Sequence, residues 1–229
     1  MSSNHDARKS LLRRGLERAI RGAFTKAYET VKVDPQNYLR HLRAAYNLPV
    51  RTYDGVYSVN LALLDEVAEE TIRGSMKIAA AEGAGLGFGG MLTIIPDLGI
   101  LAAITIRMIQ KLSLIYGFAY TTEQEEAELW VAAASAAGVD ISRELVEKRV
   151  VAKFIPRVIQ LIAASASREM VEKWAVRLIP VVSAAIGAGL NYYFVRVWGG
   201  RAAGHFRQRH IATRQKMLAE SESPALRGL

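Results

Sequence analysis

The side chains that most often carry catalysis or bind metals are few and scattered in this 229-residue chain. It contains no cysteine, which excludes disulfides, thiolate nucleophiles and cysteine-ligated metals. Its four histidines are His5, His41, His205 and His210, and no HExxH motif accompanies them. His205 and His210 are five positions apart, which does not place both on one helix face. Because nucleophile-elbow and P-loop motifs are also missing, the sequence predicts no catalytic residue, no metal site and no cofactor.

Three polar residues interrupt apolar stretches and are candidates for a ligand-binding or other polar centre: Asp97, Arg107 and Asn191. Asp97 and Arg107 are ten positions apart in one expected helix, too far along the axis to touch, so a pairing needs another helix. A simpler interpretation places Asp97 in a first helical turn, where free N–H groups and the helix dipole stabilise a carboxylate. Buried polar groups need partners, so we expect Arg107 and Asn191 each to have a buried polar partner.

A glycine-rich run, Gly83 to Gly90 (GAGLGFGG), formally contains the dinucleotide-binding pattern GxGxxG. No strand precedes the run and no βαβ unit surrounds it, which argues against a nucleotide site. Small residues four positions apart instead favour close helix packing. The glycines expected at such packing positions are Gly83, Gly85, Gly87, Gly89, Gly187 and Gly189.

Positive charge gathers at both ends of the chain, whose formal charge is +8. Residues 1–30 hold seven Lys/Arg against three Asp/Glu, and residues 196–229 hold seven against two. Residues 53–195 are mildly acidic, with twelve Lys/Arg and sixteen Asp/Glu. Basic ends suggest an anionic partner, and the alternative is a solvated helix face. No aromatic-basic platform or recognition module is visible, which argues against nucleic acid.

Residues 6–30 have the spacing of a basic amphipathic helix, which lies on a membrane or packs at a domain edge. On a membrane we expect apolar insertion through Leu12, Leu16 and Phe24. We expect the anionic surface to be bound by Arg13, Arg14, Arg18, Arg21, Arg196, Arg201, Arg207 and Arg209. Tyr192, Tyr193 and Trp198 border an apolar run beside arginines, as in an interfacial aromatic belt.

Two long apolar segments, Gly83 to Ile106 and Leu178 to Val195, dominate the rest of the chain. They align at an offset of 84 residues through an Ile-Pro step in each, Ile95-Pro96 and Ile179-Pro180. Two explanations fit: a duplication giving a loose internal repeat, or two buried helices with similar packing needs. A charge such as Asp97 costs a few kcal/mol inside a bilayer, so we expect the segments to pack together in a core rather than span independently.

Helical periodicity runs through almost the whole chain and predicts an all-α, multi-helix bundle with two Gly/Ala-rich apolar central helices. Asp34-Pro35 is a start signal, Thr122 to Glu125 a capping box, Gly117 a stop, and Pro156 a break or kink. The expected helices cover residues 6–30, 35–46, 60–81, 97–116, 123–137, 141–155, 157–178, 180–198 and 200–219.

The order of several motifs resembles the EcsC protein family. These motifs are Gly85 to Gly90 (GLGFGG), Ile95-Pro96-Asp97, Arg107, Ile115-Tyr116-Gly117, and the later Ile179-Pro180, Gly187 and Asn191. The resemblance covers residues 60–215 and implies a bacterial, helical, membrane-associated protein; it supplies no catalytic residue. The expected organisation is a basic N-terminal helical extension (1–52), an EcsC-like helical domain (53–219) and a flexible tail (220–229).

Two functions from different classes follow. The first is a non-enzymatic protein at the inner face of the cytoplasmic membrane, held peripherally by anionic lipid or a membrane protein, with a lipid or small apolar molecule as a further ligand. The first apolar run begins well past residue 30, so we expect no secretory signal. The alternative is a soluble ligand-binding protein or enzyme with a polar site around Asp97, Arg107 and Asn191.

Overall fold

The computed structural model describes residues 2–86, 94–141, 151–175 and 183–226. Within these ranges the chain forms seven α-helices, one short 3-10 helix and no strand, which confirms the predicted all-α bundle. The elements are α1 (Ser2–Thr30), α2 (Pro35–Tyr46), η1 (Asp54–Ser58), α3 (Leu61–Leu86), α4 (Ile94–Ile115), α5 (Glu123–Ala136), α7 (Val151–Ala175) and α8 (Ser183–Leu226).

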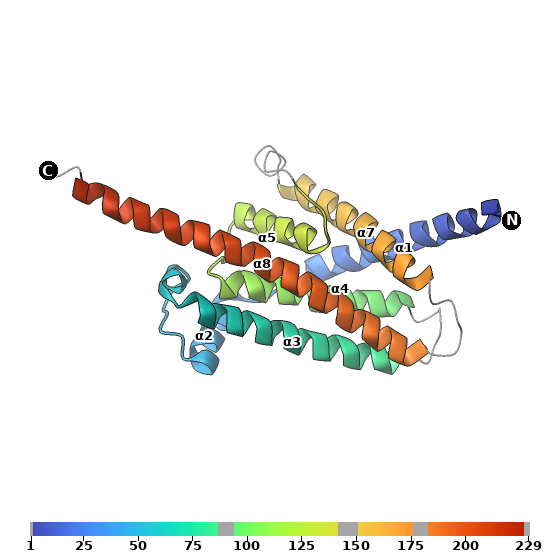
Figure 1. Cartoon of the computed structure of the whole chain (residues 1–229), viewed down its shortest axis with the longest axis horizontal. Coiled ribbons are helices and arrows are strands. Elements are labelled where there is room, and N and C mark those ends of the chain that lie inside the picture. Colours follow the sequence, from blue (N-terminus) through green and yellow to red (C-terminus); the bar gives the residue numbers. More distant parts are fainter. Residues whose placement is uncertain (1, 87–93, 142–150, 176–182, 227–229) are drawn as a thin grey trace.

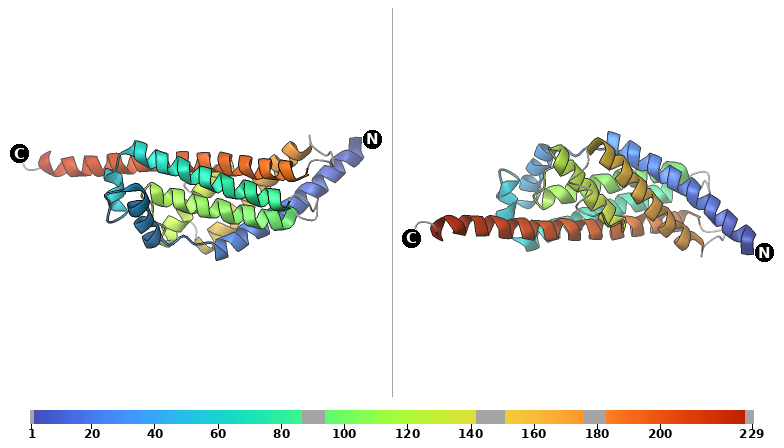
Figure 2. Two further views of the ribbon diagram at one scale, coloured as in Figure 1. Left: turned by 90° about the horizontal axis from the view of Figure 1, so that it is seen from below. Right: turned by 90° about the horizontal axis from the view of Figure 1, so that it is seen from above.

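The helices form an elongated bundle in which α8 packs on α3, α4 and α5, while α1 packs on α4 and α7 (Figure 1). The first half of α1 and the last part of α8 project beyond the body at opposite ends, and both further views show the same arrangement (Figure 2). The end of α3 and the starts of α4 and α8 lie at the end from which α1 projects. The described helical parts of the two apolar segments therefore begin at the same end of the molecule.

Several helix boundaries follow local sequence signals. Asp34 caps α2 by accepting a hydrogen bond from the Asn37 backbone N–H at 2.6 Å, with Pro35 at the first position. Thr122 and Glu125 form the expected capping box of α5. Gly117 follows α4 with a φ of +93°, a conformation that favours glycine and ends the helix. These signals act within one turn, which is why the sequence alone predicts them.

Of the break or kink expected at Pro156, the break is wrong, because Pro156 lies inside the continuous helix α7. Proline removes one backbone hydrogen bond, but the turns on both sides of it are anchored in the core. Phe154 and Ile155 precede the proline, Val158 follows it, and each of the three is at most 1% exposed. Packing therefore holds the helix together where the local propensity would interrupt it.

The expected break near residue 199 is also wrong, because α8 is a single helix of 44 residues. Gly199 packs so closely on neighbouring helices that a Cβ atom there would lie 2.9 Å from Ile72 Cγ1 and 3.0 Å from Met108 Sδ. The glycine permits a close helix approach instead of ending the helix. The helix also continues to Leu226, so most of the region expected to be a flexible tail is helical.

The apolar face of α1 is part of the core. Leu16, Ile20 and Phe24 are at most 8% exposed, and they belong to one cluster of buried residues that extends through α3, α4, α5, α7 and α8. Phe24 packs against Trp198 of α8 with the ring centroids 5.7 Å apart. The expected insertion of Leu16 and Phe24 into a membrane is therefore wrong in this conformation, and the side chain of Leu12 lies outside the described residues. The described buried residues of α1 and α2 belong to this same cluster.

Candidate anion-binding surface

The side of α1 that faces away from the core carries a row of basic residues. Arg14, Arg18 and Arg21 follow one another at intervals of four and three, which places them on one helix face. All three are exposed, as is Arg13. Among the described residues, no ion pair holds any of these four arginines. Their charges are therefore available to an external anion.

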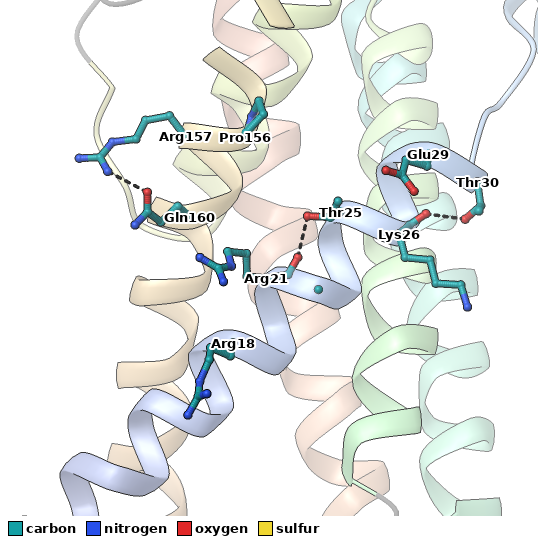
Figure 3. A pocket seen from close by; sticks show the side chains of 10 residues that line it. Arg18, Arg21, Thr25, Lys26, Glu29, Thr30, Pro156, Arg157 and Gln160 are labelled. Atoms are coloured by element: carbon teal, nitrogen blue, oxygen red, sulfur yellow. Dashed lines mark hydrogen bonds between the residues drawn. The ribbon is translucent and has the colours of Figure 1, made fainter. Parts of the chain in front are cut away.

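An open groove of about 840 Å³ lies beside this row, between α1 and α7 (Figure 3). Among its described lining residues, four are cationic and one is acidic. The lining residues are Arg18, Arg21, Gly22, Thr25, Lys26, Glu29, Thr30, Pro156, Arg157 and Gln160. In Figure 3 the Arg21 side chain extends from α1 toward α7, while Lys26 extends to the other side of α1. On the opposite wall, Arg157 donates to Gln160 Oε1 at 2.8 Å.

This groove can attract and orient an anion. Four cations and one carboxylate give the described lining residues a formal charge of +3. Three of the cations are arginines, whose planar guanidinium groups match the oxygen atoms of phosphates and carboxylates. The described lining residues include no histidine and only one carboxylate, and the chain has no cysteine, so these residues do not resemble a transition-metal site.

The arginines expected to bind an anionic surface from the C-terminal half have a different environment. Arg207 is paired with Asp65, its Nε lying 2.9 Å from Oδ2 and 3.1 Å from Oδ1. Arg209 pairs with Glu128 at 3.0 Å and lies 4.7 Å from the centre of the Phe118 ring. These two guanidinium groups hold α8 to α3 and α5.

The other two arginines predicted to bind an anionic surface from the C-terminal half differ from each other. Arg201 donates to the Ala136 carbonyl at 3.2 Å, so it ties α8 to the end of α5. Arg196 is exposed and remains a candidate for surface binding. Of the eight arginines predicted to bind an anionic surface, those whose charge is available therefore lie mainly on α1.

Asp97, Arg107 and Asn191, predicted as a polar centre, have unlike environments. Asp97 lies in the first turn of α4, as the simpler interpretation expected, although its side chain is outside the described residues. Arg107 is exposed, so the expectation of a buried partner for it is wrong. Its charge lies near Lys111, whose pKa is lowered first by burial and then by Arg107. Asn191 is 6% exposed and has an interaction partner. Arg107 and Asn191 thus share no buried centre.

The predicted packing glycines fall largely outside the described part of the chain. Gly83 and Gly85 are helical in α3, and Gly187 and Gly189 are helical in α8, but their surroundings are not described. Gly87 and Gly89 lie outside the described residues, as do Ile179 and Pro180, on which the internal-repeat hypothesis depends. The close helix approach that the structure does describe is at Gly199.

A small apolar cavity of about 20 Å³ lies where α1, α4, α7 and α8 meet. Leu98 and Leu101 of α4 line it together with Phe194 and Trp198 of α8, so the described parts of the two apolar segments do pack in one core. A space of this size holds about one water molecule. It is too small in this conformation for the lipid or apolar ligand that the sequence suggested. Trp198 is 4% exposed, so it does not belong to an interfacial belt, whereas Tyr192 and Tyr193 are exposed.

Sequence reasoning found the α1 side of the groove and missed the rest. Lys26 follows the arginine row closely, and its charge was a usable signal. Arg157 and Gln160 contribute only because α7 crosses α1, a contact between residues more than a hundred positions apart. No local pattern indicates that pairing.

Comparison with known proteins places the chain in a family. A family model described as the EcsC protein family matches residues 8–211. The chain belongs to the EcsC protein family. Protein EcsC of Bacillus subtilis (strain 168) is 40% identical to it over 68 residues, which are 30% of this chain and 29% of that protein. The match thus spans less than a third of that relative's length. No solved structure matches the chain.

The extent of the EcsC match corrects one expectation. The match begins at residue 8 rather than near residue 60, so most of α1 belongs to the EcsC region. The shared core of α1 with α4 and α7 gives a physical reason, because the bundle lacks one of its sides without α1. The division of the chain at residue 52 stays a prediction.

The structure also gives a role to the Tyr-Gly pair that carried the resemblance. The Tyr116 hydroxyl donates to Asp65 Oδ1 at 2.8 Å, and Asp65 in turn pairs with Arg207. The Tyr116 carbonyl lies 2.9 Å from Nδ1 of His210, a fully buried residue of α8. At the same corner Gly117 has a φ of +93°. In this member of the family the Tyr-Gly pair therefore joins the end of α4 to α3 and α8.

Proposed function

We propose that this protein is a binding protein that associates peripherally with an anionic membrane surface through α1. The observation that carries the proposal is the exposed arginine row of α1, on a helix whose opposite face is fixed in the core. A rigid anchor orients the row and lowers the entropy cost of binding.

Electrostatics gives the association its strength. A Lys or Arg beside an anionic lipid surface contributes about 1 kcal/mol, and this contribution falls off within a Debye length of about 8 Å at physiological salt. The first half of α1 projects beyond the body of the bundle (Figure 2). Leu11, which is 64% exposed, lies on this projecting part and is available for shallow contact with lipid.

Apolar features of the fold support a peripheral rather than a spanning arrangement. Among the described residues, one window, Leu98–Ile115 of α4, is long and apolar enough to cross a membrane. In this structure 67% of that window is buried inside the bundle, as in the core helix of a water-exposed fold. Tyr192 and Tyr193, which are 42% and 39% exposed on α8, have the amphipathic character of residues found at a membrane interface.

Vesicle flotation tests this proposal. The purified full-length protein should float with vesicles that contain anionic lipid, float far less with neutral phosphatidylcholine vesicles, and be released as salt rises. Equal flotation with anionic and neutral vesicles, or none with either, would contradict the proposal. Binding to duplex DNA at the same salt with equal affinity would show that the basic row acts as a general polyanion site.

A further inference from the structure

We infer that the groove between α1 and α7 is a specific site for a phosphate monoester, such as the headgroup of a phosphatidic-acid-type lipid. The inference rests on the proposed membrane association and deepens it, because it assigns one headgroup chemistry to one place on the surface. A diffuse basic surface binds all anionic lipids according to their charge, whereas a groove with cations on two walls discriminates among them.

The two walls supply the positive charge from different helices. Arg18 and Arg21 come from α1, and Arg157 comes from α7 (Figure 3). Guanidinium groups bind phosphate oxygens in bidentate fashion, so arginines from two helices offer more than one site of contact to an anion in the groove. The groove volume of about 840 Å³ admits a headgroup rather than only an inorganic ion.

Charge favours a monoester over a singly charged headgroup. Even without Lys26, which extends to the other side of α1 in Figure 3, the described lining residues Arg18, Arg21, Arg157 and Glu29 have a formal charge of +2. A phosphate monoester carries about −1.5 to −2 charges near neutral pH and has three terminal oxygens, whereas a phosphodiester carries one charge and two such oxygens. The electrostatic attraction of the groove is therefore stronger for the monoester than for the phosphodiester.

Gly22 leaves part of the groove on the α1 side open. A Cβ atom at Gly22 would meet no atom within 4 Å, and the same holds for Gly15, two helical turns earlier on α1. Both glycines are exposed, and only Gly22 lines the groove. A glutamate at either position adds the same charge to α1 and has a higher helix propensity than glycine, so neither substitution is expected to unfold the helix. Gly15→Glu is therefore a matched control for Gly22→Glu.

The decisive experiment measures binding to phosphatidic acid vesicles and to phosphatidylglycerol vesicles of equal surface charge. The unmodified protein should bind the phosphatidic acid vesicles about tenfold more tightly. Gly22→Glu should abolish this preference, and Gly15→Glu should keep it while weakening binding to both vesicles equally. Arg157→Gln, on the opposite wall, should also reduce the preference. Circular dichroism confirms that each variant is folded.

Two results would overturn the inference while leaving the proposed function intact. One is equal binding of the unmodified protein to the two anionic vesicles; the other is identical behaviour of Gly15→Glu and Gly22→Glu. By contrast, a failure to bind any anionic vesicle would contradict the proposed membrane association.

A soluble competitor identifies the source of the phosphate. Glycerol-3-phosphate carries the monoester headgroup without acyl chains, and its binding can be followed by calorimetry with the same variants. If it binds the unmodified protein but not Gly22→Glu, and displaces the protein from vesicles, the groove takes a free phosphate monoester. If it neither binds nor competes while the vesicle preference persists, the groove takes the headgroup only within a lipid surface. Binding that is equal in both glutamate variants would contradict a site in the groove.

Discussion

The two basic ends of this chain look alike in sequence and differ in the fold. Residues 1–30 and residues 196–229 each contain seven Lys/Arg. In α1 the arginines stand opposite the face that packs into the core, so they point to solvent. In α8 the helix lies across α3, α4 and α5, so Arg207 and Arg209 meet the carboxylates of Asp65 and Glu128.

Positive charge in a sequence is therefore not the same as positive charge available to a partner. An arginine already paired with a carboxylate adds little attraction for an external anion, because the pair is close to neutral. What decides availability is the set of elements against which the helix packs. Stability measurements show how firmly each basic end is held, and vesicle binding shows which of them is free.

The largest effect is expected where α1 is anchored. Phe24→Ala should lower the free energy of unfolding by roughly 3 kcal/mol, because Phe24 is buried against Trp198 and truncation leaves a cavity. Leu11→Ala, at an exposed position of the same helix, should change it by less than about 0.5 kcal/mol. Urea denaturation followed by circular dichroism measures both. If Phe24→Ala were as stable as the parent but no longer bound vesicles, α1 would act by insertion, contrary to this comparison.

A smaller effect is expected where α8 is anchored. Gly199→Ala should cost about 2 kcal/mol, because its Cβ would meet Ile72 and Met108 at 3.0 Å or less, and both of those residues are buried. The neighbouring Gly200→Ala is a control, since nothing lies within 4 Å of its Cβ and the higher helix propensity should add up to about 1 kcal/mol. Thermal or urea unfolding separates the two. Equal stabilisation by both substitutions would mean that α8 does not lie as close to α3 and α4 as described.

The smallest effect is expected from a histidine among the arginines of α8. Burial, and then the nearby charge of Arg209, lowers the pKa of His205 to about 4, compared with about 6.5 in an unfolded chain. Below pH 6.5 the unfolded state therefore takes up a proton that the folded state does not. Stability should fall as the pH drops from about 6.5 to about 4, and this residue should contribute nothing above that window.

The size of this pH effect is limited by partial exposure. His205 is not fully buried, so its contribution should be about 1 kcal/mol rather than the full value of the pKa shift. His205→Gln is the control, because glutamine has no proton to bind in this range. Urea unfolding at pH 7.5 and pH 4.5 should show a smaller loss for His205→Gln than for the parent. An equal or larger loss would contradict the burial of the ring.

Local signals explain which parts of the fold the sequence predicts. The Asp34 cap, the Thr122–Glu125 capping box and the stop at Gly117 depend on residues within a few positions, and all three are confirmed. The breaks expected at Pro156 and near Gly199 failed because distant residues decide them. Core packing on either side of Pro156 and the approach of Ile72 to Gly199 outweigh the local preference.

The candidate site is likewise predictable from the sequence only in the part that depends on a local pattern. The arginine row on α1 is visible in the sequence because its spacing is that of a helix. Arg157 enters the groove only through the crossing of α7 and α1. Asp65, which forms an ion pair with Arg207, lies 142 residues before it in the chain. Pairings of this kind depend on the tertiary fold. Charge patterning alone therefore assigned eight arginines to one anion-binding surface, whereas in the structure some of them are exposed and others are held by contacts within the fold.

The vesicle affinity of two variants, each with four arginines replaced by glutamine, shows whether packing determines which basic end binds anions. One variant carries the changes at Arg13, Arg14, Arg18 and Arg21, and the other at Arg196, Arg201, Arg207 and Arg209. Each lowers the formal charge from +8 to +4, so net charge is matched.

At about 1 kcal/mol for each available charge, the first variant should lose affinity for anionic vesicles by at least about a hundredfold. The second should lose less than about tenfold, since only Arg196 is freely exposed without a described contact, and it should show its main effect as lower stability. Equal loss of vesicle affinity in the two folded variants would contradict the claim that packing determines which basic end is available.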